Sequence, residues 1–246
     1  MRIKSFFSAL AVLLFSASVH AQPPKLVLQI TVDQLRGDML PRFGDRLGES
    51  GFRYLLENGT VYQDAWFSHA NTMTAVGHAT LATGGNTPEH GMAANDWYER
   101  SLGRRVNAVE DTQSPFIGGA VGDSSGRSPR HLTSSTFSDE LVLASGGRSR
   151  AFGVSTKDRG AIITAGLQGK AYWYSTTTGR YQTTTWYHDE YPAWMKAWNQ
   201  KKMSDGFAGA TWNLLGDRDE YIFAGQDDRP FELPRGELGN TFPHRM

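Results

Sequence analysis

Cysteine is absent from this chain of 246 residues, and no apolar run in it reaches the length of a membrane span. Without thiolates, disulfide-stapled miniproteins and Cys-ligated zinc sites are excluded, and any metal must be held by oxygen and nitrogen ligands. The chain also lacks a net charge, because 25 basic residues balance 25 acidic ones. There is accordingly no electrostatic case for nucleic-acid binding. A phosphate-bearing substrate has to be attracted locally, by a metal or by a few placed cations.

The N-terminus has the pattern of an export signal. Arg2 and Lys4 precede an apolar run over 6–19, and Val19-His20-Ala21 suits signal peptidase. The run is shorter than the roughly 20 residues that a membrane span needs. We predict a signal peptide over 1–21, a periplasmic or secreted protein, and no stable membrane insertion after cleavage. Removing two of the 25 basic residues leaves 23 against 25 acidic residues, a net charge of −2.

Strand-like and helix-like segments alternate along the chain, which predicts an α/β fold with a largely parallel sheet flanked by helices. The segment KLVLQITV is a short and nearly continuous apolar run, as in a central parallel strand. It is followed by a helical pattern that stops at Asn58-Gly59, a helix C-cap, and then by a second strand pattern. The expected strands are 25–32, 60–67 and 151–155, and the expected helices are 47–58, 74–83 and 135–144. The first three of these segments in chain order would form a β-α-β unit.

Composition divides the chain into three segments. After the signal peptide, we predict the N-terminal part of a catalytic domain over 22–168. Tyr and Trp then crowd residues 169–212. We predict an aromatic-rich subdomain, with the start of a further part, over 169–246. The aromatic residues can wall a substrate pocket or pack on the main sheet, and the sequence leaves both open.

Asp33 and Thr74 stand at positions where α/β proteins often carry chemistry. Asp33 follows the first predicted strand, at the carboxyl end where ligands gather. Thr74 opens the predicted helix over 74–83, and a helix N-terminus favours an anion. A threonine hydroxyl becomes a nucleophile only with a base or a metal. From the residues alone, helix capping remains the alternative role for both.

Asn95, Lys157 and Arg159 are the candidates for phosphate binding. The Asn95 amide can donate to a phosphoryl oxygen, although Asn is also a common turn residue. Lys157 and Arg159 share one short loop after the strand predicted over 151–155. Cations in loops are usually solvated, but a Lys and Arg pair at the carboxyl edge of a sheet can clamp a dianionic phosphate.

These motifs together resemble the phosphate-irrepressible (PafA-type) alkaline phosphatases, which share a superfamily with type I phosphodiesterase/nucleotide pyrophosphatases. The matching residues are Asp33, Thr74 in TMTAVGH, the following LATGGNTPEHG, Asn95 in ANDWY, and Lys157 with Arg159 in STKDRG. The resemblance covers about 25–160 and continues more weakly to the end. It implies an alkaline phosphatase-like fold and a metal-dependent phosphomonoesterase that hydrolyses small-molecule phosphate esters through a phosphothreonine.

The resemblance also implies a role for each matching residue. Thr74 would be the nucleophile, and Asn95 and Lys157 would bind the non-bridging phosphoryl oxygens with Arg159 beside them. Asp33 and Thr74 would be ligands of one of two Zn²⁺ ions. Two metals about 3.5–4 Å apart stabilise the attacking and leaving oxygens alike.

The chain departs from this family in its metal ligands. Family members take their remaining Asp and His ligands from a region that would lie beyond Met246, so we expect the N-terminal portion of a larger enzyme. The histidines show no paired ligand spacing, and we interpret His78 and His90 as structural. Two alternatives stay open: a phosphodiesterase of the nucleotide pyrophosphatase type, and an inactive phosphate-binding fragment. The sequence gives no indication of oligomeric state.

Overall fold

The computed structural model of the protein describes residues 24–119, 125–221, 225, 228–233 and 238–246. It divides into two units, 1–60 and 61–246. The predicted signal peptide over 1–21 lies outside the described residues. No helix within the described ranges has the length and apolar character needed to cross a membrane.

The first unit contains helices but no strand among its described residues. Its elements are α2 (Met39–Arg42), the short 3-10 helix η1 (Gly44–Arg46) and α3 (Phe52–Asn58). The helix predicted over 47–58 forms only in its second half, and it ends at Asn58 as expected. Gly59 is the C-cap, and its N–H donates to the carbonyl oxygen of Leu55.

The strands predicted over 25–32 and 60–67 are wrong. Both segments are coil and turn in the structure, and apolar side chains in them are largely exposed, including Leu26, Ile30 and Trp66. An apolar pattern becomes a strand only when a neighbouring strand pairs with its backbone. No described strand pairs with either segment. The predicted β-α-β unit over 25–67 is therefore not present.

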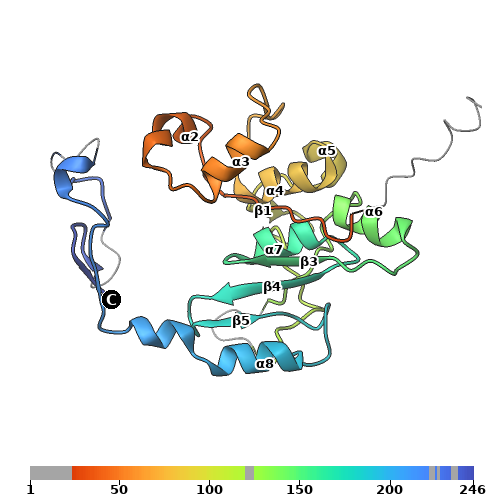
Figure 1. The fold of residues 1–246 in the computed structure, drawn as a ribbon. Coiled ribbons are helices and arrows are strands. Elements are labelled where there is room, and N and C mark those ends of the chain that lie inside the picture. Colours follow the sequence, from red (N-terminus) through yellow and green to blue (C-terminus); the bar gives the residue numbers. More distant parts are fainter. Residues whose placement is uncertain (1–23, 120–124, 222–224, 226–227, 234–237) are drawn as a thin grey trace, which may run out of the picture. The chain divides into compact units, whose positions relative to one another are not determined.

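The second unit contains a β-α-β unit at another place, residues 152–175. Strand β3 (Phe152–Ser155) runs parallel to β4 (Lys170–Ser175), and helix α7 (Asp158–Ala165) connects them (Figure 1). Strand β5 (Arg180–Gln182) then adds antiparallel to β4, in the sheet order β3-β4-β5. The strand predicted over 151–155 is confirmed.

Helix α7 lies very close to β3. A Cβ atom added at Gly153 would lie 2.0 Å from the carbonyl oxygen of Ala161, so only glycine fits there. On its other side α7 packs against α4 (Thr74–Thr83), which has the predicted bounds. The buried faces of the two helices carry small and branched residues such as Ala75, Ala79 and Ile162. This packing fixes the N-termini of α4 and α7 in one rigid core.

Two further helices follow capping signals in the sequence. Helix α6 (Phe137–Ala144) begins two residues later than the predicted 135–144, because Thr136 is its N-cap and pairs with Asp139 in a capping box. Helix α5 (Thr87–His90) follows α4 in the chain. It is closed by the same kind of box between Asn86 and Glu89.

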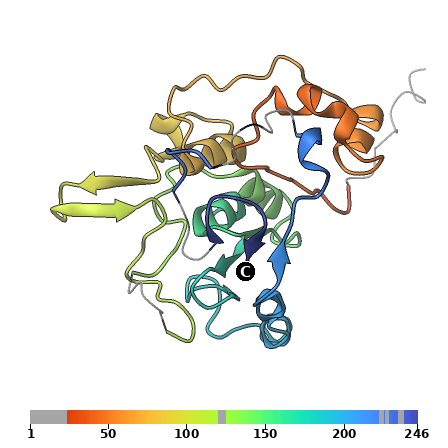
Figure 2. The same ribbon diagram turned by 90° about the vertical axis from the view of Figure 1, so that its left-hand side faces the viewer.

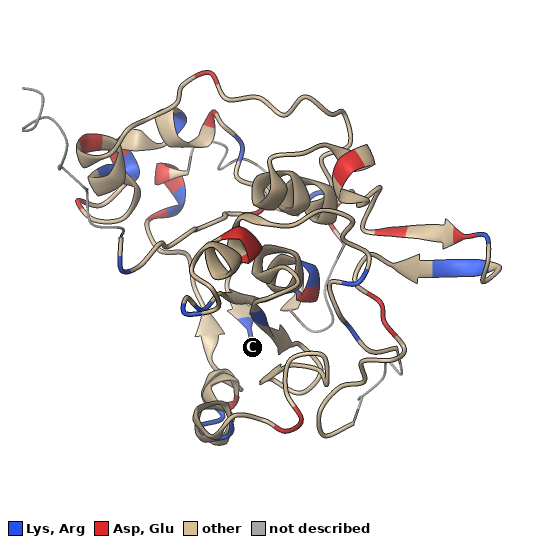
Figure 3. Ribbon diagram, turned by 90° about the vertical axis from the view of Figure 1, so that its right-hand side faces the viewer, with Lys and Arg blue, Asp and Glu red and all other residues tan. Residues whose placement is uncertain are grey.

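The remaining described elements lie outside this core. Strands β1 (Asp96–Glu99) and β2 (Arg104–Asn107) form a hairpin that projects from the unit (Figure 2). Figure 3 shows acidic residues on β1 and basic residues on β2, and Arg105 pairs with Asp96 across the strands. The later elements are α8 (Ala193–Gln200), η2 (Met203–Phe207), β6 (Thr211–Trp212), η3 (Arg218–Glu220) and β7 (His244–Arg245).

Aromatic residues of the segment after residue 169 lie both in the core and at surface pockets. Trp173 and Tyr187 are buried in the core. Tyr174 and Trp198 line pockets at the surface. The predicted segment boundaries 22–168 and 169–246 stay a prediction.

Candidate active site

Thr74 is the first residue of α4. The N-cap position belongs to Met73, whose backbone is extended, so Thr74 itself is not the N-cap in the structure. The N–H of the next residue, Ala75, donates to Asn95 Oδ1 over 2.9 Å. Asn95 thus supplies the side-chain oxygen that satisfies an N-terminal helix donor.

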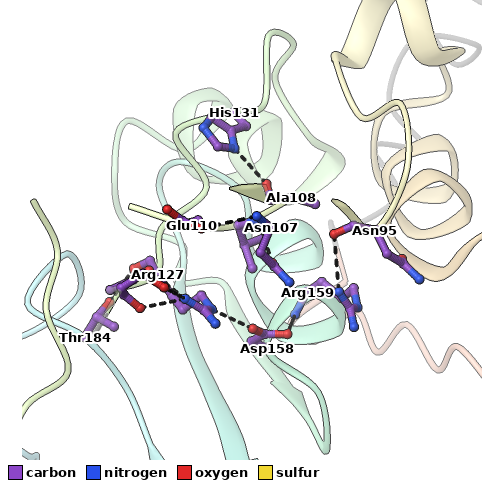
Figure 4. Close-up of polar contacts among 12 residues, drawn as sticks. Asn95, Asn107, Ala108, Glu110, Arg127, His131, Asp158, Arg159 and Thr184 are labelled. Atoms are coloured by element: carbon purple, nitrogen blue, oxygen red, sulfur yellow. Dashed lines mark hydrogen bonds and ion pairs between the residues drawn. The ribbon is translucent and has the colours of Figure 1, made fainter. Parts of the chain in front are cut away.

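This bond also fixes the orientation of the Asn95 amide. With Oδ1 turned toward α4, Nδ2 is the atom that can donate to a substrate oxygen. The Asn95 carbonyl oxygen accepts a hydrogen bond of 3.4 Å from Arg159 Nη1 (Figure 4). The structure therefore brings three of the predicted residues together: Thr74, Asn95 and Arg159.

The Arg159 guanidinium is not fully paired. Its Nε is buried and has no hydrogen-bond partner among the described residues, and the bond from Nη1 is long. A buried N–H of a cation without an acceptor is costly, and most buried donors in folded proteins are paired. The arrangement suits an anionic acceptor at this position.

Lys157 lies at the N-cap position of α7, two residues before Arg159, and its side chain is exposed. It lines a pocket of about 270 Å³ together with Arg127, Trp173 and Tyr174. A second pocket of about 260 Å³ also includes Tyr174 and is lined mainly by apolar surface. Lys157 thus shares a pocket with cationic and aromatic side chains.

Asp33 belongs to the first unit, where it lies in a turn closed by a hydrogen bond from the Leu35 N–H to the Val32 carbonyl. Within the described residues, no group of three or more His, Cys, Asp or Glu side chains could hold a metal ion. Asp33 and Thr74 remain candidate donors, but the described residues do not by themselves form a two-zinc site.

His78 and His90 have structural surroundings. His78 is buried, and its Nδ1 hydrogen-bonds with the Thr74 carbonyl oxygen over 2.8 Å. His90 is fully buried between the Met92 N–H and the Thr80 hydroxyl. Burial lowers the pKa of His90, so it is neutral near pH 7. Both rings brace α4 at its N-terminus and in its later turns.

An ion pair that the sequence interpretation missed lies beside Lys157 and Arg159. Arg127 Nε donates to Asp158 Oδ2 over 2.7 Å, and both side chains are largely buried. The signal available in the sequence was an acidic residue between two cations at the start of a helix. Arg127 itself lies in a weakly patterned stretch that gives no sign of its partner.

Comparisons with known proteins indicate the family of the chain. The family described as type I phosphodiesterase / nucleotide pyrophosphatase matches residues 27–229. The chain is 36% identical over 232 residues to a protein of Myroides odoratus named calcium-transporting ATPase, covering 94% of this chain and 42% of that protein. It is 35% identical over 246 residues to alkaline phosphatase PafA of Elizabethkingia meningoseptica, covering 96% and 44%.

Two solved structures, both titled as alkaline phosphatase PafA, share this fold. The wild type has a TM-score of 0.83 and 36% identity, over 92% of this chain and 44% of that one. The α/β, alkaline phosphatase-like fold class is thereby confirmed, although two of its predicted strands are absent here. The chain spans less than half the length of each of these proteins.

The second structure is titled as a mutant of PafA, with a TM-score of 0.81 and 33% identity over 87% of this chain and 42% of that one. Its title names substitutions of a Thr, an Asn, a Lys and an Arg. The intervals between those positions are 21, 62 and 2 residues. Thr74, Asn95, Lys157 and Arg159 have the same residue types at the same intervals.

Proposed function

The chain belongs to the type I phosphodiesterase / nucleotide pyrophosphatase family, and on that premise we propose that it contributes the nucleophile and the phosphate clamp of a phosphomonoesterase. The substrate class is small-molecule phosphate monoesters. The observation that carries the proposal is the buried Arg159 Nε without a described partner, close to the N-terminus of the helix that Thr74 begins. A phosphoryl oxygen is the acceptor that this donor lacks.

The chemistry assigned to this chain is a two-step transfer. The Thr74 hydroxyl oxygen attacks phosphorus as its proton passes to solvent, and the bond from phosphorus to the leaving oxygen breaks on the opposite side. The leaving group takes a proton from solvent and departs as an alcohol. Water then cleaves the phosphothreonine and releases inorganic phosphate. Asn95, Lys157 and Arg159 stabilise the charge on the non-bridging oxygens. The shared residue types and intervals in the PafA mutant title support these assignments.

We also propose that the full-length protein uses zinc, with Asp33 and Thr74 as two of the donors. A bound metal would favour the deprotonated hydroxyl of Thr74. The described residues hold no group of three such donors, so the remaining ligands are proposed to lie in other parts of the full-length protein. Export to the periplasm or beyond completes the proposal. It is supported by the pattern of residues 1–21, and N-terminal sequencing of the exported protein checks it.

A measurement of zinc content tests whether the protein uses zinc as proposed. We expect two Zn²⁺ per full-length protein and at most one weakly bound ion in a protein limited to residues 22–246, because metal affinity follows the number of donors. Elemental analysis after dialysis against metal-free buffer gives the ratio. Two tightly bound ions in residues 22–246 would contradict the proposed sharing of ligands with sequence outside this chain. A full-length protein that turns over without bound metal would refute the zinc proposal.

A phosphodiesterase is the second candidate, because the description of the matching family names that activity. Two cations at the start of α7, Lys157 and Arg159, favour the monoester, which carries one more negative charge than a diester. We expect the full-length protein to hydrolyse an aryl phosphate monoester with a higher kcat/KM than a methyl diester with the same leaving group. Steady-state assays of the two substrates in one buffer decide between the candidates. A higher kcat/KM on the diester would replace the monoesterase proposal.

A further inference from the structure

Helix α7 begins with an acidic residue where the proposed substrate brings negative charge. Asp158 lies between Lys157 and Arg159, the two cations of the proposed clamp. Close charges interact strongly in partly buried surroundings, so a bare carboxylate at this position would repel a phosphate dianion and weaken the clamp. In the structure a third cation, Arg127, pairs with this carboxylate.

Arg127 neutralises this carboxylate. Its Nε donates to Asp158 Oδ2 over 2.7 Å, with 9% of the Arg127 side chain and 18% of the Asp158 side chain exposed. The other carboxylate oxygen, Oδ1, accepts from the backbone N–H of Arg159 over 2.8 Å. Figure 4 shows Asp158 between the two arginines, so that one carboxylate joins the buried cation to the clamp.

Arg127 is itself held rigidly. Its Nη1 donates to the carbonyl oxygens of Ser125 and Gly126 over 2.6 and 3.0 Å. Its own carbonyl oxygen accepts from the Thr184 hydroxyl over 2.7 Å, and its guanidinium lies 5.8 Å from the centre of the Phe116 ring. A cation with this many fixed contacts loses little conformational entropy when it orients its partner.

The contacts continue from Arg127 to the nucleophile. Asp158 holds the Arg159 backbone, the Arg159 side chain reaches the Asn95 carbonyl, and the Asn95 side chain caps the N–H of Ala75. Thr74 directly precedes Ala75. A displacement at the start of α7 is therefore transmitted to the clamp and to the orientation of the amide donor.

We propose that Arg127 and Asp158 are a positioning pair that presents Lys157 and Arg159 to a dianionic phosphate, and so sets the preference for monoesters over diesters. This inference rests on the proposed function. Neither member of the pair is assigned a bond to the substrate. Arg127 offsets the carboxylate, and the carboxylate fixes the first turn of α7.

The test uses the full-length protein and two substrates with one leaving group, a phosphate monoester and its methyl diester. Arg127→Met leaves the carboxylate unpaired, so we expect kcat/KM on the monoester to fall about 100-fold and on the diester less than about 10-fold. Asp158→Asn removes the charge but keeps an oxygen for the Arg159 N–H, and the monoester loss should be only about 10-fold.

The double variant gives the sharpest outcome. Adding Asp158→Asn to Arg127→Met removes the unpaired negative charge, so monoester activity should rise about 10-fold above that of Arg127→Met alone. Inorganic phosphate, used as a competitive inhibitor, should follow the same order of affinities. Arg127→Lys keeps the positive charge but lacks the planar guanidinium. It replaces Arg127→Met in the test if that variant does not fold. It should lower the monoester/diester ratio at least twofold.

Asp139→Asn is the matched control. Asp139 is a buried carboxylate of the same unit that accepts from the N–H groups of Thr136 and Gln168, away from the start of α7. It should lower the melting temperature without changing the monoester/diester ratio. Equal losses on both substrates in folded Arg127 and Asp158 variants would overturn the positioning role. Undiminished turnover in folded Thr74→Ala, measured beside them, would instead refute the proposed function.

Discussion

Replacing Thr74 with Ala in the full-length protein will lower phosphate release at least about 10³-fold, which is the scale on which removal of a covalent nucleophile acts. We expect a loss of this size because no other hydroxyl is proposed to accept the phosphoryl group. Phosphate release from a monoester, measured under saturating substrate, gives the effect on kcat. Trapping at low pH followed by mass spectrometry should show a phosphoryl group on the wild-type protein and none on Thr74→Ala.

The structure separates this effect from a loss of helix capping. A side-chain cap contributes about 1 kcal/mol to stability, but the N-cap of α4 is Met73, and the helix donor at Ala75 is satisfied by Asn95. We expect the melting temperature of Thr74→Ala to stay within a few degrees of wild type.

Thr83→Ala is the matched control for Thr74→Ala. Thr83 ends the same helix, and its hydroxyl donates to the Ala79 carbonyl oxygen over 2.8 Å. This variant should keep near-wild-type turnover. A folded Thr74→Ala protein with undiminished turnover would remove the nucleophile assignment.

Helix α4 could be predicted to the residue because its signals are local. Small apolar residues recur at helical spacing within 74–83, and Gly84 follows in the left-handed conformation that favours glycine at a helix C-terminus. Helix α7 (Asp158–Ala165) was not predicted, because Lys157 and Arg159 were expected in a loop, although a strand precedes it and Gly166 caps its C-terminus. Such signals act within a few residues and are legible without knowledge of the rest of the fold.

The wrong strand predictions concern a property that is not local. Residues 25–32 have the composition of a buried parallel strand, yet a strand is stabilised by its partners rather than by its own sequence. The pattern 151–155 is no stronger, but β4 lies beside it and pairs with it. Sequence therefore located segments that can form strands, while the available neighbours decided which of them did.

The site shows the same division. The family resemblance selected Thr74, Asn95, Lys157 and Arg159. In the structure Asn95 is bonded to Arg159 and to the N–H of Ala75, the residue after Thr74. The bond from Arg127 to Asp158 spans 31 residues of chain, and the buried Arg159 Nε depends on how two helices pack. Neither property leaves a pattern in the sequence.

Lys157→Ala tests whether the site is built for a dianion. A charge-assisted hydrogen bond contributes about 1.5–3 kcal/mol, against about 1 kcal/mol for a neutral one. At about 1.4 kcal/mol per tenfold, and allowing for lost Coulomb attraction, we expect a roughly 10- to 1000-fold loss of kcat/KM on a monoester. A diester with the same leaving group should lose clearly less. Because the Nε of Arg159 is buried, we expect Arg159→Ala to show a loss of similar size. Lys196→Ala removes an exposed cation of α8 that pairs with Glu190. This variant should leave kcat/KM on both substrates unchanged. Equal losses on monoester and diester in Lys157→Ala would mean that the lysine acts through general structure, and the phosphodiesterase would then become the better assignment.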